Sequence, residues 1–137
     1  MPKELRTVEG DLLARDLRFA IVATRFNELV VNLLVDGVVD ALVRHGASEK
    51  NLELVRVPGA YEMPLAIRKL ALSRRYDAIV ALGAVVRGQT AHFDFVAGEC
   101  SSGVARVALE TGIPVGFGVL TTETMEQALD RAGGKAG

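Results

Sequence analysis

The residues best suited to chemistry gather in one short polar loop that follows an apolar run. Residues 78–82 have the composition of a buried strand, and we expect Gly83 to end it. A helix is expected to begin near His92, because apolar residues recur at helical spacing from there. The loop between them contains Arg87, Gly88, Gln89 and Thr90. A glycine-containing loop at a helix N-terminus offers N–H groups to an anion, and a histidine there can move protons near neutral pH. The segment therefore predicts phosphate binding beside proton transfer.

The rest of the chain alternates apolar runs of strand length with segments of helical periodicity. We expect strands at 18–23, 51–57, 78–82 and 113–120, and helices at 28–44, 61–74, 92–111 and 124–132. Asn27 and Gly46 suit the N-cap and the left-handed C-cap of the first helix. Strands that are continuously apolar are typical of a parallel sheet covered on both faces. The pattern predicts a single-domain α/β protein, a flavodoxin-like three-layer α/β/α sandwich with a four-stranded parallel core sheet.

In such a sheet, ligands bind outside the carboxyl ends of the strands. The segments expected to leave those ends are 24–27, 58–62, 84–92 and 117–122. They contain two aromatic side chains, Phe26 and Tyr61, the carboxylate of Glu62, the polar loop and His92. This combination suits a flat polar ring together with a phosphate.

Each candidate also has a purely structural interpretation. His92 could simply be an exposed residue at a helix start, and Phe26 could cap the core as readily as stack on a ligand. An acid such as Glu62 is favoured in a first helical turn by the dipole alone. Arg87 fits a surface cation as well as an intramolecular partner for an acid. Arg131, near the end of the last predicted helix, could serve only as a dipole partner.

Composition excludes several classes of function. The 137 residues are 50% hydrophobic and 24% charged, with a net charge of −1, so bulk-charge binding to nucleic acid or to an anionic membrane is not expected. The single cysteine, Cys100, allows no internal disulfide and suits the core. The sequence has no signal-peptide pattern and no apolar run of about 18 residues, which favours a cytoplasmic protein. The sequence has no Walker phosphate-binding loop, no G-x-G-x-x-G after the first expected strand and no G-x-S-x-G nucleophile motif. It also has no Cys/His cluster with the spacing of metal ligands.

Five motifs in order along the chain give the sequence a specific resemblance. They are R-F-N at 25–27, R-V-P-G-A-Y-E at 56–62, G-A-V-V-R-G-Q-T-A-H-F-D at 83–94, F-G-V-L-T at 117–121 and E-Q-A-L-D-R-A-G at 126–133. At these residues the sequence resembles the lumazine synthases of riboflavin biosynthesis, over nearly its whole length. None of the motifs is specific alone, but the set is.

The resemblance implies a transferase that catalyses the penultimate step of riboflavin biosynthesis. Such enzymes condense 5-amino-6-(D-ribitylamino)uracil with 3,4-dihydroxy-2-butanone 4-phosphate to 6,7-dimethyl-8-ribityllumazine, releasing phosphate and water. The resemblance also implies that neither a metal nor an organic cofactor is needed. His92 would be the catalytic proton shuttle. The implied substrate-binding residues are Phe26, Ala60, Tyr61, Glu62, Ala84, Val85, Val86 and Phe117, the last from a neighbouring subunit, and the implied phosphate ligands are Gln89, Thr90 and Arg131.

The resemblance further implies a homo-oligomer. Family members form pentamers, and some pack twelve pentamers into an icosahedral 60-mer; the G-G-K-A-G at 133–137 resembles the turn of shell-forming members. Riboflavin synthase is a further expected partner. The segment before Arg18, including a short strand at 8–10, is expected to add to a neighbouring subunit's sheet. The family's C-terminal helix has no counterpart in the sequence, which ends at Gly137.

Three other functions stay open at this level. The chain could be a non-catalytic carrier of lumazine or flavin, a structural shell protein, or a riboflavin synthase on a similar fold. An intact His92 beside Gln89 and Thr90 favours the enzyme, because a carrier needs neither a proton shuttle nor a phosphate site.

Overall fold

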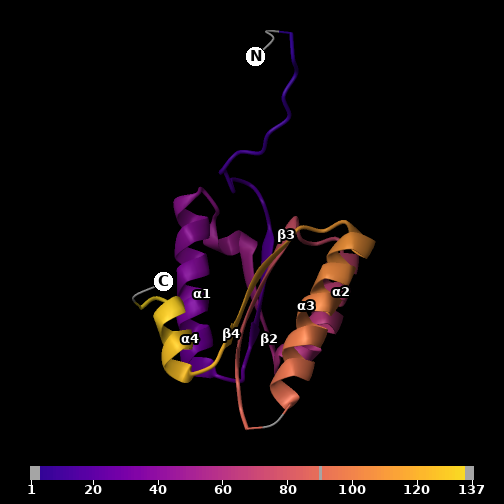
Figure 1. Cartoon of the computed structure of the whole chain (residues 1–137). Coiled ribbons are helices and arrows are strands. Elements are labelled where there is room, and N and C mark those ends of the chain that lie inside the picture. The colour runs from indigo at the N-terminus through magenta and orange to yellow at the C-terminus, as the bar shows by residue number, and fades with distance from the viewer. Residues whose placement is uncertain (1–3, 90, 135–137) are drawn as a thin grey trace.

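The computed structural model describes residues 4–89 and 91–134, and within them four parallel strands form one sheet (Figure 1). The strands are β1 (Phe19–Thr24), β2 (Leu52–Val57), β3 (Ala78–Val86) and β4 (Val115–Thr122), in the spatial order β2-β1-β3-β4. The chain adds β2 on one side of β1 and then β3 and β4 on the other. The crevice that such a reversal creates lies between the connections that leave β1 and β3.

Helices cover both faces of the sheet. They are α1 (Glu28–Arg44), α2 (Met63–Leu72), α3 (His92–Thr111) and α4 (Met125–Arg131), with short 3-10 turns at Glu49–Asn51 and Ala60–Glu62. Figure 1 shows α1 and α4 on one face and α2 and α3 on the other. The predicted flavodoxin-like three-layer α/β/α sandwich with a four-stranded parallel sheet is therefore confirmed.

Two apolar cores lie on the two faces of the sheet, which explains the continuous apolar runs of the strands. All six residues of β1 are buried, with odd and even positions facing different cores. The core under α2 and α3 includes Met63, Ile67, Cys100 and Val104, and the core under α1 and α4 includes Val30, Val31 and Ala128. Burial raises the pKa of Cys100 to about 11, so the thiol stays neutral and packs as a small apolar residue, as expected.

The prediction that Gly83 ends its strand is wrong. β3 continues to Val86 and pairs with β4 from Gly83 opposite Val119 to Val86 opposite Thr122. A Cβ atom on Gly83 would lie 3.2 Å from the side chain of Thr24. The glycine therefore permits a close approach between neighbouring strands, which is a common reason for glycine inside a strand.

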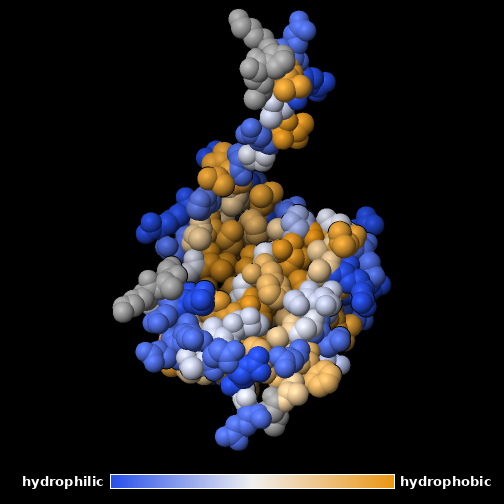
Figure 2. All heavy atoms as spheres, in the orientation of Figure 1, coloured by the Kyte–Doolittle hydropathy of each residue, from blue (hydrophilic) through white to orange (hydrophobic). Residues whose placement is uncertain are grey.

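Residues 4–13 form an arm that leads away from the body of the molecule (Figures 1 and 2), and Ala14 joins the body, where it is buried and its N–H donates to the carbonyl oxygen of His45 at 2.8 Å. Within the described residues 4–17 there is no strand, so the segment 8–10 is not paired within this single chain. Apolar side chains of the arm are exposed: Leu5, Val8, Leu12 and Leu13. None of the helices in the described ranges is long and apolar enough to cross a membrane.

Candidate functional site

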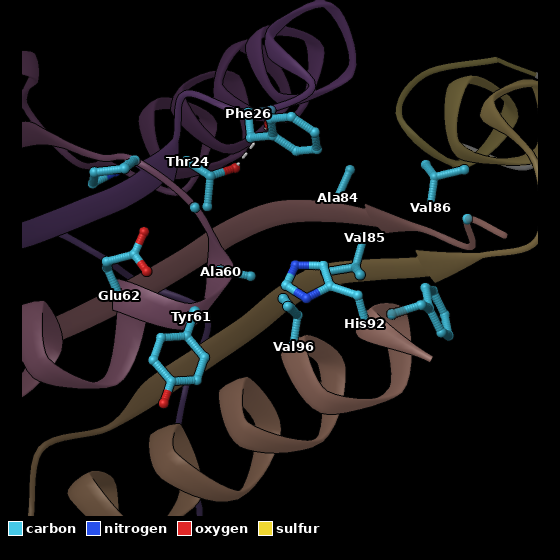
Figure 3. A pocket seen from close by; sticks show the side chains of 14 residues that line it. Thr24, Phe26, Ala60, Tyr61, Glu62, Ala84, Val85, Val86, His92 and Val96 are labelled. Carbon is cyan, nitrogen blue, oxygen red and sulfur yellow. Dashed lines mark hydrogen bonds between the residues drawn. The ribbon is translucent and has the colours of Figure 1, made fainter. Parts of the chain in front are cut away.

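A pocket of about 580 Å³ lies at the carboxyl ends of β1 and β3 (Figure 3). It opens between the 3-10 turn Ala60–Glu62 and the first turns of α3. Its lining residues are Thr24, Phe26, Pro58, Gly59, Ala60, Tyr61, Glu62, Ala84, Val85, Val86, Gly88, His92, Phe93 and Val96. The volume is within the range of small-molecule sites in proteins. The pocket is thus at the position where a sheet of this topology binds ligands.

Two exposed aromatic rings stand beside a buried apolar floor. Ala60 and Ala84 are buried at the base, whereas Phe26 is 71% exposed and Tyr61 is 62% exposed. Phe26 therefore does not cap the core. Exposed aromatic faces next to a concave apolar surface suit stacking on a flat ring.

Two ionisable side chains line the pocket from different elements. Glu62 ends the 3-10 turn after β2, and His92 begins α3. Figure 3 shows the imidazole of His92 directed over the pocket toward Val85, with Glu62 and Tyr61 across from it. A carboxylate can accept hydrogen bonds from ligand hydroxyls, and an imidazole can exchange protons at neutral pH. The pocket can therefore orient a polar ligand and move protons on it.

Backbone hydrogen bonds hold the loop after β1 against the loop after β2. The N–H of Arg25 donates to the carbonyl oxygen of Val57 at 2.8 Å, and the N–H of Phe26 donates to that of Pro58 at 3.1 Å. These bonds extend the strand pairing beyond the end of the sheet. They fix the backbone of Phe26 beside the residues that form the base of the pocket.

Asn27 fastens the same loop to β3. Its side-chain Nδ2 donates to the carbonyl oxygen of Ala84 at 2.8 Å. Asn27 occupies the predicted N-cap position of α1, but its backbone is left-handed, with φ 60°, and its side chain makes no capping hydrogen bond to the described first turn of the helix. Asparagine tolerates this conformation better than most residues. Asn27 thus connects the Phe26 loop with the strand end that lines the pocket.

Comparison with known proteins shows which family the chain belongs to. The sequence model of 6,7-dimethyl-8-ribityllumazine synthase matches residues 16–137. The chain belongs to the 6,7-dimethyl-8-ribityllumazine synthase family. It is 58% identical over 133 residues to the 6,7-dimethyl-8-ribityllumazine synthase of Nitratidesulfovibrio vulgaris strain DP4, covering 97% of this chain and 85% of that relative. The protein of the same name from Edwardsiella ictaluri strain 93-146 is 60% identical over 134 residues, covering 97% of this chain and 86% of the relative.

Membership of the lumazine synthase family confirms the resemblance drawn from the five motifs. It makes the protein an enzyme, a transferase of riboflavin biosynthesis. The structure brings most of the predicted site residues of this family into one pocket: Phe26, Ala60, Tyr61, Glu62, Ala84, Val85, Val86 and His92.

Three predicted site residues within the described part of the chain, Gln89, Arg131 and Phe117, do not line this pocket. Gln89 is exposed in the loop next to Gly88, and Thr90 lies outside the described residues. Arg131 is exposed at the end of α4, on the face of the sheet opposite α3. Phe117 is 48% exposed inside β4, opposite Ala81, so the prediction that 117–122 leave the sheet as a connection is wrong.

Sequence reasoning missed two lining residues on α3. Phe93 and Val96 join His92 in the pocket wall. The available signal was helical spacing, because residues four apart, such as His92 and Val96, share a helix face. Both side chains also pack against the core under α2 and α3.

Proposed function

We propose that this pocket condenses 5-amino-6-(D-ribitylamino)uracil with 3,4-dihydroxy-2-butanone 4-phosphate to 6,7-dimethyl-8-ribityllumazine, with release of phosphate and water. The observation that carries the proposal is the meeting of Phe26, Glu62 and His92 around one apolar pocket of about 580 Å³. A stacking surface, a hydrogen-bonding carboxylate and a proton-transfer group are what a flat, hydroxylated substrate and this chemistry require.

The proposed binding mode follows from the lining side chains. The pyrimidine stacks on Phe26, whose ring is exposed at the mouth of the pocket. The ribityl chain lies along residues 60–62, where Glu62 accepts hydrogen bonds from its hydroxyls. The end of β3, from Ala84 to Val86, forms the opposite wall. This arrangement aligns two substrates in a preformed site, and alignment alone can supply a large part of a rate enhancement.

His92 is the proposed proton shuttle. Imine formation and loss of phosphate require proton transfers in both directions, and an imidazole has one ring nitrogen that can accept a proton and one that can donate it. Phosphate departs as an anion beside the N-terminus of α3, where the helix dipole favours negative charge. We assign Gln89, Thr90 and Arg131 to the phosphate. Since Arg131 lies outside the pocket of its own chain, this role requires the Arg131 of a neighbouring copy.

We propose a cytoplasmic homo-oligomer, a pentamer that can build an icosahedral 60-mer, with riboflavin synthase as a further partner. β2 and β4 are the edge strands of the described sheet, and Figure 2 shows apolar side chains on the face in front of β4. Phe117 is exposed there and is available to complete the pocket of a neighbour. The apolar arm at 4–13 is suited to add a strand to an adjacent sheet. The shell motif at 133–137 lies partly outside the described residues.

Turnover tests the proposed reaction. The purified chain, given both substrates, should produce the absorbance of 6,7-dimethyl-8-ribityllumazine with release of one phosphate per product. Given 6,7-dimethyl-8-ribityllumazine alone, it should form no riboflavin. Tight binding of product without turnover would instead identify a carrier, and riboflavin formation from lumazine alone would identify a riboflavin synthase.

Asn27 provides a prediction about how the pocket is held together. Asn27→Gly keeps the left-handed backbone but removes the 2.8 Å bond to Ala84, so product affinity should fall about 5-fold, the worth of one ordinary hydrogen bond. Asn27→Asp keeps the shape and sets a carboxylate oxygen against the Ala84 carbonyl, so affinity should fall further, by about 10-fold or more. Adding protein to the fluorescent product and following its emission measures the affinity of each variant. Equal affinity in all three proteins would show that the bond does not order the pocket.

A further inference from the structure

Arg87 is a charged residue of the site region that the proposed chemistry does not use. It follows directly after β3, and its N–H donates to the carbonyl oxygen of Thr122 at 2.9 Å, extending the pairing of β3 with β4 by one residue. Its side chain is 42% exposed, so it is neither buried in the core nor extended freely into solvent. The guanidinium therefore has defined neighbours.

The guanidinium of Arg87 contacts three groups, one in the connection after β4 and two on α3. Its Nε lies 2.9 Å from Oε2 of Glu123, which follows β4. Its Nη2 lies 3.5 Å from Oδ1 of Asp94, in the first turn of α3. Its Cζ is 4.6 Å from the centre of the Phe93 ring, within the range of a cation–π contact. Arginine suits such a site because its planar fork can contact carboxylates and an aromatic face at once.

These contacts join the two ends of the polar loop. The loop begins after Arg87, and α3 begins at His92, directly before the two residues of α3 that the guanidinium contacts. Phe93 also lines the pocket. The Arg87 side chain thus links Glu123, at the edge of the sheet, to the turn of α3 that carries His92.

We infer that Arg87 is a positioning residue, which holds the first turn of α3 so that the His92 imidazole faces the pocket. The inference rests on the proposed role of His92. A single exposed ion pair stabilises a protein little. Here two carboxylates and a ring share one guanidinium, and the group they hold is a short helix start beside a loop. The expected effect is therefore on the geometry of His92 more than on global stability.

A cation beside a proposed phosphate site could instead bind that phosphate directly. The contacts argue against this for Arg87, because its guanidinium is directed to Glu123, Asp94 and Phe93, and two of these are anions that an incoming phosphate would have to displace. The two roles differ in one measurable respect. A positioning residue acts through His92, and a phosphate ligand acts whether or not His92 is present.

A double-mutant cycle separates the two roles. Arg87→Met should lower kcat about 10-fold in the otherwise unchanged protein, but less than about 2-fold in the His92→Ala background, because residues that act as a unit are not additive. Arg87→Lys should recover only part of the rate, since an ammonium group cannot make the same planar contacts. The matched control is Arg68→Met, which breaks a 2.7 Å ion pair to Glu110 near the other end of α3 and should leave kcat unchanged. The same loss of rate in both His92 backgrounds would overturn the inference.

Hydrogen–deuterium exchange gives a readout that does not depend on turnover. In Arg87→Met, the amides that donate to carbonyl oxygens of the first turn of α3 should exchange about 10-fold faster than in the unchanged protein, while those within α2 keep their rate. Unchanged exchange of those α3 amides would overturn the inference even if activity fell. Absence of turnover in the unchanged protein would contradict the proposed function alone, and the exchange result would still decide whether Arg87 anchors the helix.

Discussion

Replacing His92 by alanine should lower kcat by about 10²-fold, at the lower end of the range for loss of a general acid–base group. The imidazole faces the pocket from the first turn of α3, where proton transfers of imine formation and phosphate loss would take place. The loss stays moderate because alignment of the two substrates by Phe26 and the pocket walls remains intact. Steady-state rates of lumazine formation measure the effect.

The second histidine is the matched control. His45 ends α1, with Nδ1 2.6 Å from the carbonyl oxygen of Ala41, and it does not line the pocket. His45→Ala should therefore leave kcat within about 2-fold of the unchanged value, as a surface substitution away from the site. Product affinity should be retained in His92→Ala. If both histidine variants had equal rates, or if His92→Ala lost product binding as well, His92 would not be the proton shuttle.

Two glycines of α3 should respond in opposite directions to the same change. A Cβ on Gly103 would lie 2.5 Å from Cγ of Pro64 on α2, which is too close for real atoms. Gly103→Ala should therefore lower the free energy of unfolding by about 1–3 kcal/mol, the usual cost of overpacking. A Cβ on Gly98 would meet nothing within 4 Å in the described parts of the chain, so Gly98→Ala should raise the free energy of unfolding by about 0.5–1 kcal/mol through helix propensity.

Urea unfolding at one fixed protein concentration measures both glycine variants, since association would otherwise change the apparent stability. The two variants share the same helix, the same substitution and the same gain in helix propensity. They differ only in the contact between α2 and α3, which the comparison therefore isolates. A stability gain of equal size at both positions would show that α2 and α3 do not approach as closely at Gly103 as the structure has it.

The fold was predictable from the sequence because its central strands, β1 and β3, are buried along almost their whole length. Runs such as 78–82 contain little but apolar residues, and that pattern is characteristic of a parallel sheet. Gly83 was misassigned because glycine has two meanings in such a run. It can end a strand, or it can permit a neighbour to approach closely, and only the position of Thr24 in space distinguishes the two.

The residues of the site were predictable where they follow strand ends, and their connections were not. His92, Glu62 and Phe26 come directly after strands or begin helices, so the topology alone brings them to one edge of the sheet. The position of Asn27 before α1 suggested a helix cap. Its bond to Ala84 was not predictable, because it joins residues 57 positions apart. Arg87 looked equally like a surface charge. Local sequence patterns contain no information on which distant group a polar side chain will contact.

In the proposed function, the two substrates are joined in the pocket between β1, β3 and α3. A crystal structure of the protein with bound 6,7-dimethyl-8-ribityllumazine would show whether this is so. We expect the ring stacked on Phe26, the ribityl chain along residues 60–62 beside Glu62, and the His92 imidazole facing the new ring. Product bound at another surface of the protein, with this pocket left unoccupied, would show that the substrates are joined elsewhere.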